Sequence, residues 1–341
     1  MPLDSTHGFK TTSLRAILTL LLAAVLAAGA WLAYGLLLPI GPKGQEKFVL
    51  LRPGSSARHI ARDLQNEGMI RSAAAFLLWH EWRGRPALKA GEYKFDHPAA
   101  AREVYDRIVT GDIYVHTVVI PEGYNTFDIA NAIQSAGLGA SDDFLTVARS
   151  DVSLISDLDP QAPSLEGYLF PDTYEFTRTQ SLHDMAAAMV KRFRQENHQL
   201  GLNTDLHQVV TMASIVEKET AVPSERPLVA GVFYNRLHRH IVLATDPTVI
   251  YAALLAGRYN GVIHQSDLQF DSAYNTYKHA GLPPGPICNP GRDSLQAAMQ
   301  PASSNFLYFV SDNNGHHRFA RTMEEHSRNV AAYRRAVAAS R

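Results

Sequence analysis

The sequence has a single cysteine among its 341 residues, and this scarcity excludes two kinds of site. One thiol cannot close a disulfide within the chain, and it cannot supply the thiolate cluster of a structural zinc site. The residue, Cys288, lies in the segment Pro-Ile-Cys-Asn-Pro with no obvious base beside it. We therefore interpret it as a loop residue rather than a nucleophile.

An excess of charge of one sign is also missing, since the formal net charge is −1. A protein without a strongly basic surface has no general attraction for nucleic acid, so we expect no nucleic-acid partner. The chain has 15 histidines, but the pairs His238/His240 and His316/His317 lack the spacing of metal ligands on a helix. We expect no metal and no cofactor.

Charged residues are absent from Ala16 to Leu38, a stretch long enough to cross a hydrocarbon core as a helix. A cleaved signal peptide is the alternative, but its apolar core would be shorter. Lys10 and Arg15 precede the span and Lys43 and Lys47 follow it, so the positive-inside rule barely discriminates between orientations. We expect an uncleaved single-pass anchor in the inner (cytoplasmic) membrane, with the larger part periplasmic.

The order of composition and pattern along the chain predicts five segments. These are a cytoplasmic N-terminus (1–15), a transmembrane helix (16–38), a linker rich in proline and glycine (39–46), a first small domain (47–113) and a larger second domain (114–341).

An internal repeat occupies the first two hundred residues. Phe48–Ile70 matches Thr117–Gly139 at a constant offset of 69 residues, which pairs Gly54 with Gly123. Each copy predicts a strand, a glycine turn and an amphipathic helix, the first capped by Ser55 or Ser56.

Both copies continue with a second helix, a short strand and a third helix. In the first copy the second helix is expected at Ser72–Trp82, the strand around Leu88, Gly91 and Tyr93, and the third helix at Ala99–Val109. In the second copy the corresponding elements are expected at Ser141–Arg149, around Leu165, Gly167 and Tyr168, and at Leu182–Gln195. This order resembles a LysM-type glycan-binding module in the first copy, with a second LysM-like strand–helix unit at 114–200. Two plain spacer units would have the same pattern. The fold class predicted is α+β.

The candidate catalytic carboxylate lies on a helix expected from Asp205 to Thr220. Glu217 follows Val210 by seven positions and lies on or beside the apolar stripe, where desolvation would make it a usable general acid. Glu219 projects to roughly the opposite face, so the two do not form a carboxylate pair. The alternative is that Glu217 makes a buried ion pair with Arg226 or Arg236.

Two polar segments follow that helix. In Leu243–Leu254, Asp246 is a predicted N-cap and Pro247 occupies the first turn. The segment Tyr274–Gly291 begins Tyr-Asn-Thr-Tyr and continues with glycine and proline, a combination of rings, amides and hydroxyls that suits a sugar-binding cleft. A turn-rich surface loop has the same composition. A hairpin (Phe306–Ala320) and a capping box (Thr322–Glu325) complete the chain.

Several long motifs occur in a fixed order, and together they resemble the endolytic murein transglycosylase (YceG-like) family. They are EGYLFPDTYEF (Glu166–Phe176), ASIVEKET (Ala213–Thr220), SERPLVAGVFYNRL (Ser224–Leu237), LATDPTVIYA (Leu243–Ala252), AYNTYKHAGLPPGPICNPG (Ala273–Gly291) and LYFV (Leu307–Val310). The resemblance covers the chain from the anchor to the last helix, and it implies that 114–341 is the catalytic domain.

The resemblance implies a set of site residues. Glu217 takes the place of the catalytic acid/base, and its replacement by Gln is expected to remove turnover while leaving folding intact. The residues implied to contact or support glycan are Asp246, Tyr274, Asn275, Thr276 and Tyr277.

The implied reaction needs one acid/base rather than the two carboxylates of ordinary glycoside hydrolysis. It cleaves the β-1,4 bond within peptidoglycan strands and leaves 1,6-anhydroMurNAc ends, a step that would terminate strand elongation, and peptidoglycan synthases are the natural neighbours. Two alternatives stay open. One is a water-using muramidase with Asp246 or Glu166 as second carboxylate, and the other is a non-catalytic, membrane-tethered glycan-binding scaffold.

Overall fold

The computed structural model describes residues 8–202 and 205–339, so the first seven residues of the expected cytoplasmic N-terminus lie outside it. The chain divides into two compact units. Unit 1 is Met1–His116 with Thr177–Thr179, and unit 2 is Thr117–Phe176 with Gln180–Arg341. Helices and strands are mixed in both, as the α+β prediction requires.

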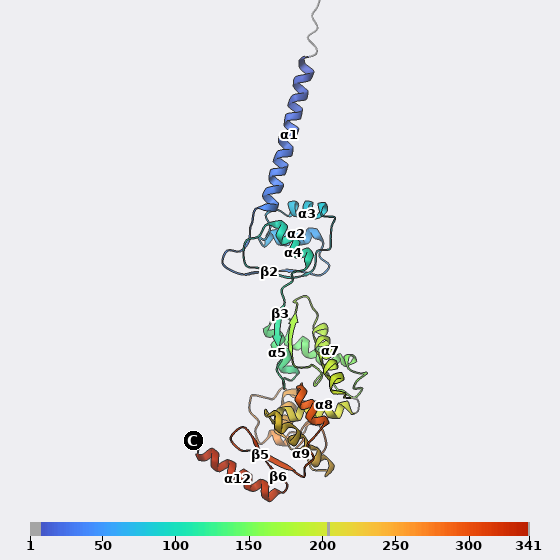
Figure 1. The fold of residues 1–341 in the computed structure, drawn as a ribbon, viewed down its shortest axis with the longest axis vertical. Coiled ribbons are helices and arrows are strands. Elements are labelled where there is room, and N and C mark those ends of the chain that lie inside the picture. Colours follow the sequence, from blue (N-terminus) through green and yellow to red (C-terminus); the bar gives the residue numbers. More distant parts are fainter. Residues whose placement is uncertain (1–7, 203–204, 340–341) are drawn as a thin grey trace, which may run out of the picture. The chain divides into compact units, whose positions relative to one another are not determined.

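Unit 1 begins with the long helix α1 (Gly8–Leu37; Figure 1). Its segment Leu14–Leu37, 24 residues, is long and apolar enough to cross a membrane, a test that a signal sequence also passes. The helix begins eight residues before the predicted span and ends one residue before its predicted end. After it, Ile40 forms an isolated antiparallel bridge with Ala99.

The rest of unit 1 follows the predicted order of strand, helix, helix, strand and helix. Strands β1 and β2 are antiparallel, with Lys47 opposite Phe95 and Leu51 opposite Gly91. Tyr93 and Tyr105 are among the fully buried side chains of the core. The elements are β1 (Lys47–Leu51), α2 (Ala57–Asn66), α3 (Ala73–Trp82), β2 (Gly91–Phe95) and α4 (Ala101–Thr110).

The repeat predicted from the sequence is visible in the backbone. Gly54 and Gly123 both have φ 78°, and Gly68 and Gly137 both have φ 70°, a left-handed conformation that glycine adopts without steric cost. The first copy begins its helix as expected, because Ser56 accepts a hydrogen bond from the backbone N–H of His59 at 3.3 Å. Whether unit 1 binds glycan as a LysM module does stays a prediction.

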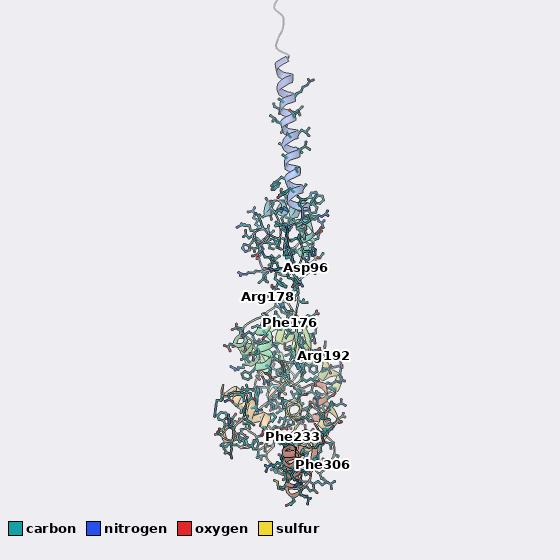
Figure 2. The ribbon with its side chains drawn as sticks, turned by 90° about the vertical axis from the view of Figure 1, so that its left-hand side faces the viewer. Asp96, Phe176, Arg178, Arg192, Phe233 and Phe306 are labelled. Carbon is teal, nitrogen blue, oxygen red and sulfur yellow. The ribbon has the colours of Figure 1, made fainter. Side chains whose placement is uncertain are left out.

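Unit 2 is mostly helical and contains two short two-stranded sheets, β3–β4 and β5–β6. Phe176 and Phe233, labelled in Figure 2, are among the large side chains buried in its core. The elements are β3 (His116–Val119), α5 (Thr126–Ser135), α6 (Ser141–Ser150), β4 (Thr173–Phe176), α7 (Leu182–Leu200), α8 (Leu206–Glu219), α9 (Arg226–His238), α10 (Asp246–Leu255), α11 (Arg292–Met299), β5 (Tyr308–Ser311), β6 (His317–Ala320) and α12 (Met323–Ala339), with single 3-10 turns at Val152–Leu154, Pro223–Glu225 and Asp267–Gln269.

The second-copy strand was predicted in the wrong place. Leu165, Gly167 and Tyr168 lie in a buried turn, and the strand β4 forms further on, at Thr173–Phe176. The side-chain oxygen of Asn289 accepts the backbone N–H groups of Gly167 and Leu169, both at 2.9 Å. These donors therefore bond to a distant loop rather than to a neighbouring strand.

The C-terminal elements form as expected. β5 and β6 are an antiparallel hairpin with Ser311 opposite His317, and Asn313 in its turn has φ 69°. Thr322 accepts the N–H of Glu325 at 3.3 Å, so it caps α12. The carboxylate of Glu325 completes the cap by accepting the N–H of Arg321 at 2.8 Å.

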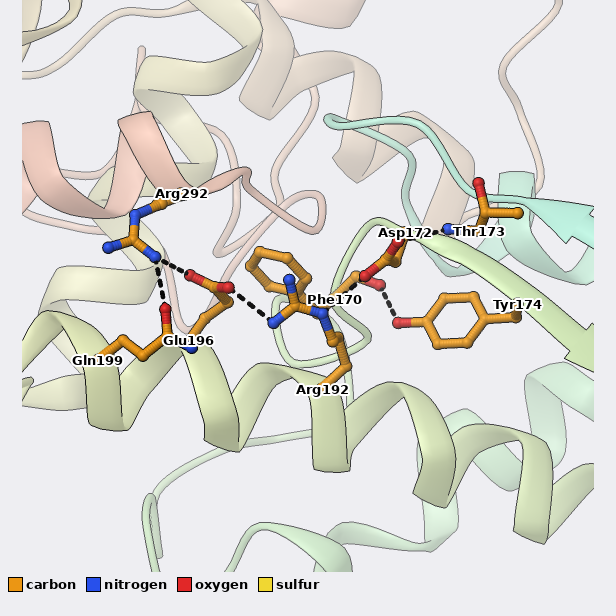
Figure 3. A network of polar contacts seen from close by, with 8 residues as sticks. All are labelled: Phe170, Asp172, Thr173, Tyr174, Arg192, Glu196, Gln199 and Arg292. Carbon is orange, nitrogen blue, oxygen red and sulfur yellow. Dashed lines mark hydrogen bonds and ion pairs between the residues drawn. The ribbon is translucent and has the colours of Figure 1, made fainter.

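A chain of polar contacts ties α7 to the segment that follows the Gly/Pro-rich loop (Figure 3). Arg292, at the start of α11, donates to Glu196 at 2.7 Å, and Glu196 also accepts from Arg192 at 2.6 Å. Arg192 continues the chain to Asp172 at 2.6 Å. Glu196 is buried between two guanidinium groups, an arrangement that fixes α11 against α7.

Candidate active site

The candidate acids lie at the C-terminal end of α8. The helix is held by buried apolar side chains, among them Val210, Ala213 and Val216, and Thr220 ends it in an extended conformation. Because Glu217 and Glu219 are two positions apart, their side chains leave the helix in different directions. They enter two different environments.

Glu217 is held in an ion pair, the alternative that the sequence left open for it. Its Oε1 lies 2.9 Å from Nη2 of Arg226, and the two side chains are 6% and 7% exposed. The backbone N–H of Gly291 donates to its other oxygen at 3.0 Å. Arg226 is the first residue of α9, directly after the turn that follows α8, so its guanidinium points back toward that helix.

Further charged groups surround Arg226. The carboxylates of Glu122 and Asp293 lie 3.6 Å and 4.0 Å from it. Burial, followed by the nearby charge of Glu217, raises the pKa of the Glu122 carboxyl. Lys218, between the two candidate acids, donates to the carbonyl of Gly123 at 3.2 Å. Glu217 is thus part of a charge cluster that links α8, α9 and the loop before α5.

Glu219 opens into a cavity of about 250 Å³ on the other side of α8. Its carboxylate accepts a hydrogen bond from the hydroxyl of Thr245, the residue before α10. Burial raises the pKa of Glu219, and the charge of Asp246 adds to that rise. The lining comprises Glu219, Phe233, Arg236, Leu243, Ala244, Thr245, Asp246, Tyr277, Phe309 and His326.

Two of the predicted glycan residues lie in this cavity. The Tyr277 hydroxyl donates to Oδ1 of Asp246 at 2.6 Å, so the two side chains hold each other at the wall. Asp246 is not the N-cap that the sequence predicted, because Thr245 is the N-cap and Asp246 is the first residue of α10. Its carboxylate is consequently directed to Tyr277.

Asn275 and Thr276 are support residues rather than contact residues, because they are 0% and 1% exposed. Asn275 donates to the carbonyl of Phe270 at 2.8 Å and accepts the N–H of Tyr277 at 3.0 Å. The Thr276 hydroxyl accepts the N–H of Thr245 at 3.1 Å. Both therefore fix the loops that carry the lining residues.

Tyr274 is half-buried and is not among the residues that line this cavity. Its ring lies 5.1 Å from that of Tyr251, centroid to centroid, and burial raises its pKa to about 12. A phenol in this setting is neutral near neutral pH.

The loop before α10 has an unusual backbone. Ala244, which lines the cavity, has φ 46°, and His240 has φ 56°. Residues other than glycine are uncommon in this region, and such conformations persist where neighbouring contacts impose them. The N–H of Ala244 is bonded to the carbonyl of Thr276 at 3.0 Å, so the Tyr-Asn-Thr-Tyr segment holds the loop in place.

The sequence did not single out three of the lining side chains. Helical spacing predicts that Glu219 lies on the opposite face from Glu217 and gives it no role. Arg236 was considered only as an ion-pair partner; its guanidinium donates to the carbonyls of Leu307 and Leu243, both at 2.7 Å. His326 on α12 stacks on Tyr308 at 5.2 Å, and burial lowers its pKa. Only tertiary packing brings α8, α9 and α12 to one cavity.

Comparison with known proteins places this geometry in a family. A model of the YceG-like family matches residues 49–332. An endolytic murein transglycosylase of Bacillus subtilis is 33% identical over 301 residues, which are 82% of this chain and 82% of the relative. An endolytic murein transglycosylase of Streptococcus pneumoniae is 31% identical over 353 residues, which cover 92% of this chain and 64% of the relative.

A solved structure agrees with the sequence matches. The crystal structure of a yceG-like protein from Listeria monocytogenes is 33% identical, covers 84% of this chain and 99% of its own, and superposes with a TM-score of 0.55. Since the family model spans most of the sequence, the chain belongs to the YceG-like family.

Proposed function

We propose that this protein is a membrane-anchored lytic transglycosylase of peptidoglycan. It cleaves the β-1,4 bond between MurNAc and GlcNAc within glycan strands and leaves 1,6-anhydroMurNAc ends. The names of its relatives in Bacillus subtilis and Streptococcus pneumoniae, endolytic murein transglycosylases, support the reaction class. Terminating the elongation of nascent strands, beside the synthases that extend them, is the role that this activity would serve on the periplasmic face of the inner membrane.

One observation carries the assignment of the acid: Glu219, rather than Glu217, opens into a cavity lined by Asp246 and Tyr277. Burial raises the pKa of Glu219, which favours the protonated form that a general acid must have. Glu217 has one oxygen on Arg226 and the other on the N–H of Gly291. Both of its oxygens already accept a hydrogen bond from the protein, so we assign Glu217 to the support of the site rather than to proton transfer.

The reaction would proceed with one proton carrier. Glu219 donates its proton to the glycosidic oxygen as the bond to C1 of MurNAc breaks. The resulting carboxylate then takes the proton of the MurNAc C6 hydroxyl, whose oxygen attacks C1 and closes the 1,6-anhydro ring. Because the nucleophile belongs to the same sugar, no water has to be bound and oriented.

Polar and aromatic groups around Glu219 suit a sugar substrate. Asp246 and Tyr277 present a carboxylate and a phenol to a ring with several hydroxyls, while the partly buried Phe309 supplies apolar surface. Buried Asn275 and Thr276 keep these groups in position, which serves precise alignment of the substrate.

The packing of α1 supports an uncleaved anchor. Leu36, in its last turn, is 5% exposed and belongs to the core of unit 1. Arg71 donates to the hydroxyl of Tyr34 at 3.2 Å and to the carbonyl of Pro39 at 3.0 Å. Removal of the whole helix as a leader would take the contacts of Tyr34 and Leu36 away from a folded unit.

Two other functions, a water-using muramidase and a glycan-binding scaffold, would give different results in the experiment described below. Asp246 shares the cavity with Glu219, which is the observation that favours a muramidase with two carboxylates. Unit 1 has a cavity of about 410 Å³ lined in part by Phe48, His59 and Asp63, which favours a glycan-binding scaffold.

Mass spectrometry of the products formed from purified glycan strands by the detergent-solubilised chain tests the proposal. Anhydro ends within shortened strands are expected. Reducing ends would assign the muramidase reaction instead, and binding without any cleavage would assign the scaffold.

A further inference from the structure

Helix α3 is apolar on the face that it exposes as well as on the face that it buries. Ala75 and Phe76 are buried in the core of unit 1. On the other side, Leu78 is 53% exposed and Trp82 is 72% exposed, and Ala74 is exposed too. These three residues are spaced by four, so they form one stripe along the helix. An apolar stripe of this kind on an otherwise folded unit indicates a surface that something covers.

The position of α3 is fixed against the end of α1. A Cβ atom added at Gly35 would lie 2.8 Å from the Cβ of Ala75, so the two helices touch where α1 has a glycine. Arg71, just before α3, lies 5.0 Å over the ring of Tyr34 and donates to its hydroxyl. The first turn of α3 is thus level with the last turn of α1.

If α1 spans a bilayer, its last turn and the first turn of α3 lie at the boundary between the hydrocarbon core and the headgroups. The apolar segment Leu14–Leu37 has 24 residues. A helix of this length rises about 36 Å, slightly more than the roughly 30 Å of a hydrocarbon core. Its last turns therefore reach the headgroup region, where Trp and Tyr side chains gather. Trp31 and Tyr34 of α1 are 45% and 53% exposed there.

α3 lies crosswise beside the end of α1, whereas β2 lies at the opposite end of unit 1 (Figure 1). A helix in this orientation runs along a membrane surface rather than through it. Arginines flank its exposed stripe. Arg83 lies 5.8 Å over the ring of Trp79 and is 44% exposed, and Arg85 pairs with Glu81 at 2.6 Å. Long basic side chains at this depth reach phosphate groups while their stems cover apolar surface.

We propose that the stripe Ala74–Leu78–Trp82 lies in the outer headgroup–acyl boundary of the membrane, so that α3 is an interfacial helix. The inference rests on the proposed membrane anchoring by α1. Its consequence is that unit 1 is held against the bilayer by two elements, a spanning helix and a surface helix.

The natural tryptophans offer a direct test, because all three of them, Trp31, Trp79 and Trp82, belong to this region. The full chain is reconstituted in vesicles of phosphatidylethanolamine and phosphatidylglycerol whose acyl chains carry bromine, a quencher confined to the lipid. Two variants each keep one tryptophan, Trp31 or Trp82, with Phe at the other two positions. Both are expected to lose most of their emission to brominated lipid and to resist aqueous iodide.

A matched control places the reporter on the sheet of unit 1. Phe48 on β1 is 41% exposed, and F48W in the chain whose natural tryptophans are all Phe is expected to respond to iodide and not to brominated lipid. If replacing Trp79 disturbs folding, a nitroxide on Leu78→Cys gives the same information without any tryptophan change. Cys288 is 0% exposed and does not compete for the label.

The outcomes separate the two proposals. Quenching of Trp31 by lipid, together with free quenching of Trp82 by iodide, would overturn the interfacial helix and leave the anchor intact. Trp31 insensitive to brominated lipid would overturn the anchor and the interfacial helix with it. Trp82 shielded from both quenchers would overturn the lipid contact in favour of a protein cover, such as a second copy of the chain.

Discussion

The guanidinium of Arg226 lies 2.9 Å from the carboxylate of Glu217, and both side chains are almost completely buried. A buried charge is stable only with its partner, so each residue depends on the other. Two positions further along the same helix, Glu219 faces the cavity that contains Asp246 and Tyr277. Because the two environments differ, replacing Glu217 by glutamine and replacing Glu219 by glutamine are expected to have different effects.

Glu219→Gln is expected to abolish formation of anhydro ends, because an amide cannot carry the proton. The loss should be of the order of 10²–10⁴-fold, the usual contribution of a general acid. Glu217→Gln should instead lower the free energy of unfolding by about 1–3 kcal/mol, since it removes the nearest of the three carboxylates around the buried Arg226 guanidinium. Product analysis and urea denaturation of both variants measure the two effects.

The matched pair also tests the sequence-based assignment. If Glu217→Gln loses all turnover with unchanged stability while Glu219→Gln remains active, the acid is Glu217 and the cavity beside Glu219 serves another purpose.

Tyr277→Phe is expected to lower kcat/KM about tenfold while leaving the fold intact. The change removes the hydroxyl that donates to Asp246 at 2.6 Å, and a bond of this kind contributes about 1.5 kcal/mol. Tyr259→Phe is the control, because Tyr259 is not among the residues lining the cavity. Equal rates for the two variants would show that the Asp246–Tyr277 contact has no part in substrate binding.

The activity should fall as the pH rises, because the acid acts in its protonated form. Burial raises the pKa of Glu219, and the negative charge of Asp246 raises it further, so the alkaline limb of kcat lies above the range of an ordinary glutamate. Asp246→Asn removes that charge and is expected to shift the limb to lower pH. A limb that stays in place, measured from initial rates of anhydro-product formation, would show that a different group controls the protonation step.

Much of the local structure could be predicted from the sequence. The repeat places Gly54 and Gly123 in matching turns, and Ser56 caps its helix, because these features depend on residues close together in the chain. The sequence predicts a strand at Gly167, but a turn forms there because the backbone N–H of Gly167 bonds to Asn289, 122 positions away. No local pattern contains that information.

The same limit applies to the site. Helical spacing correctly separated Glu217 from Glu219, but it could not tell which of the two meets a cation and which meets a cavity. Arg226 was named as a possible partner of Glu217 and the structure confirms the contact. The contact of Glu219 with Thr245, and the cavity that both line together with Tyr277, depend on two later segments of the chain.

The buried carboxyl of Glu166 allows a test of how the stability of the folded protein depends on pH. Its carboxyl is 1% exposed, and burial raises its pKa from 4.5 to about 7. It accepts hydrogen bonds from the backbone N–H and the hydroxyl of Thr126, both at 2.9 Å, from the hydroxyl of Tyr251 at 3.0 Å and from the amide of Asn289 at 3.0 Å. The folded protein therefore retains a proton on Glu166 at pH values where the unfolded chain has lost it.

The direction of the pH effect follows from this difference in bound protons. Between the unfolded pKa of 4.5 and the folded pKa of about 7, the folded state binds more protons, so stability falls as the pH rises. The loss due to this group should reach about 3 kcal/mol, because each pKa unit corresponds to about 1.4 kcal/mol. Urea denaturation across this range should show the fall in the parent chain and a smaller fall in Glu166→Gln.

Glu175→Gln, at an exposed position on β4, should retain the parent's slope of stability against pH. Identical slopes for the parent and Glu166→Gln would mean that Glu166 is ionised in the folded protein and that its four hydrogen-bond donors outweigh its burial.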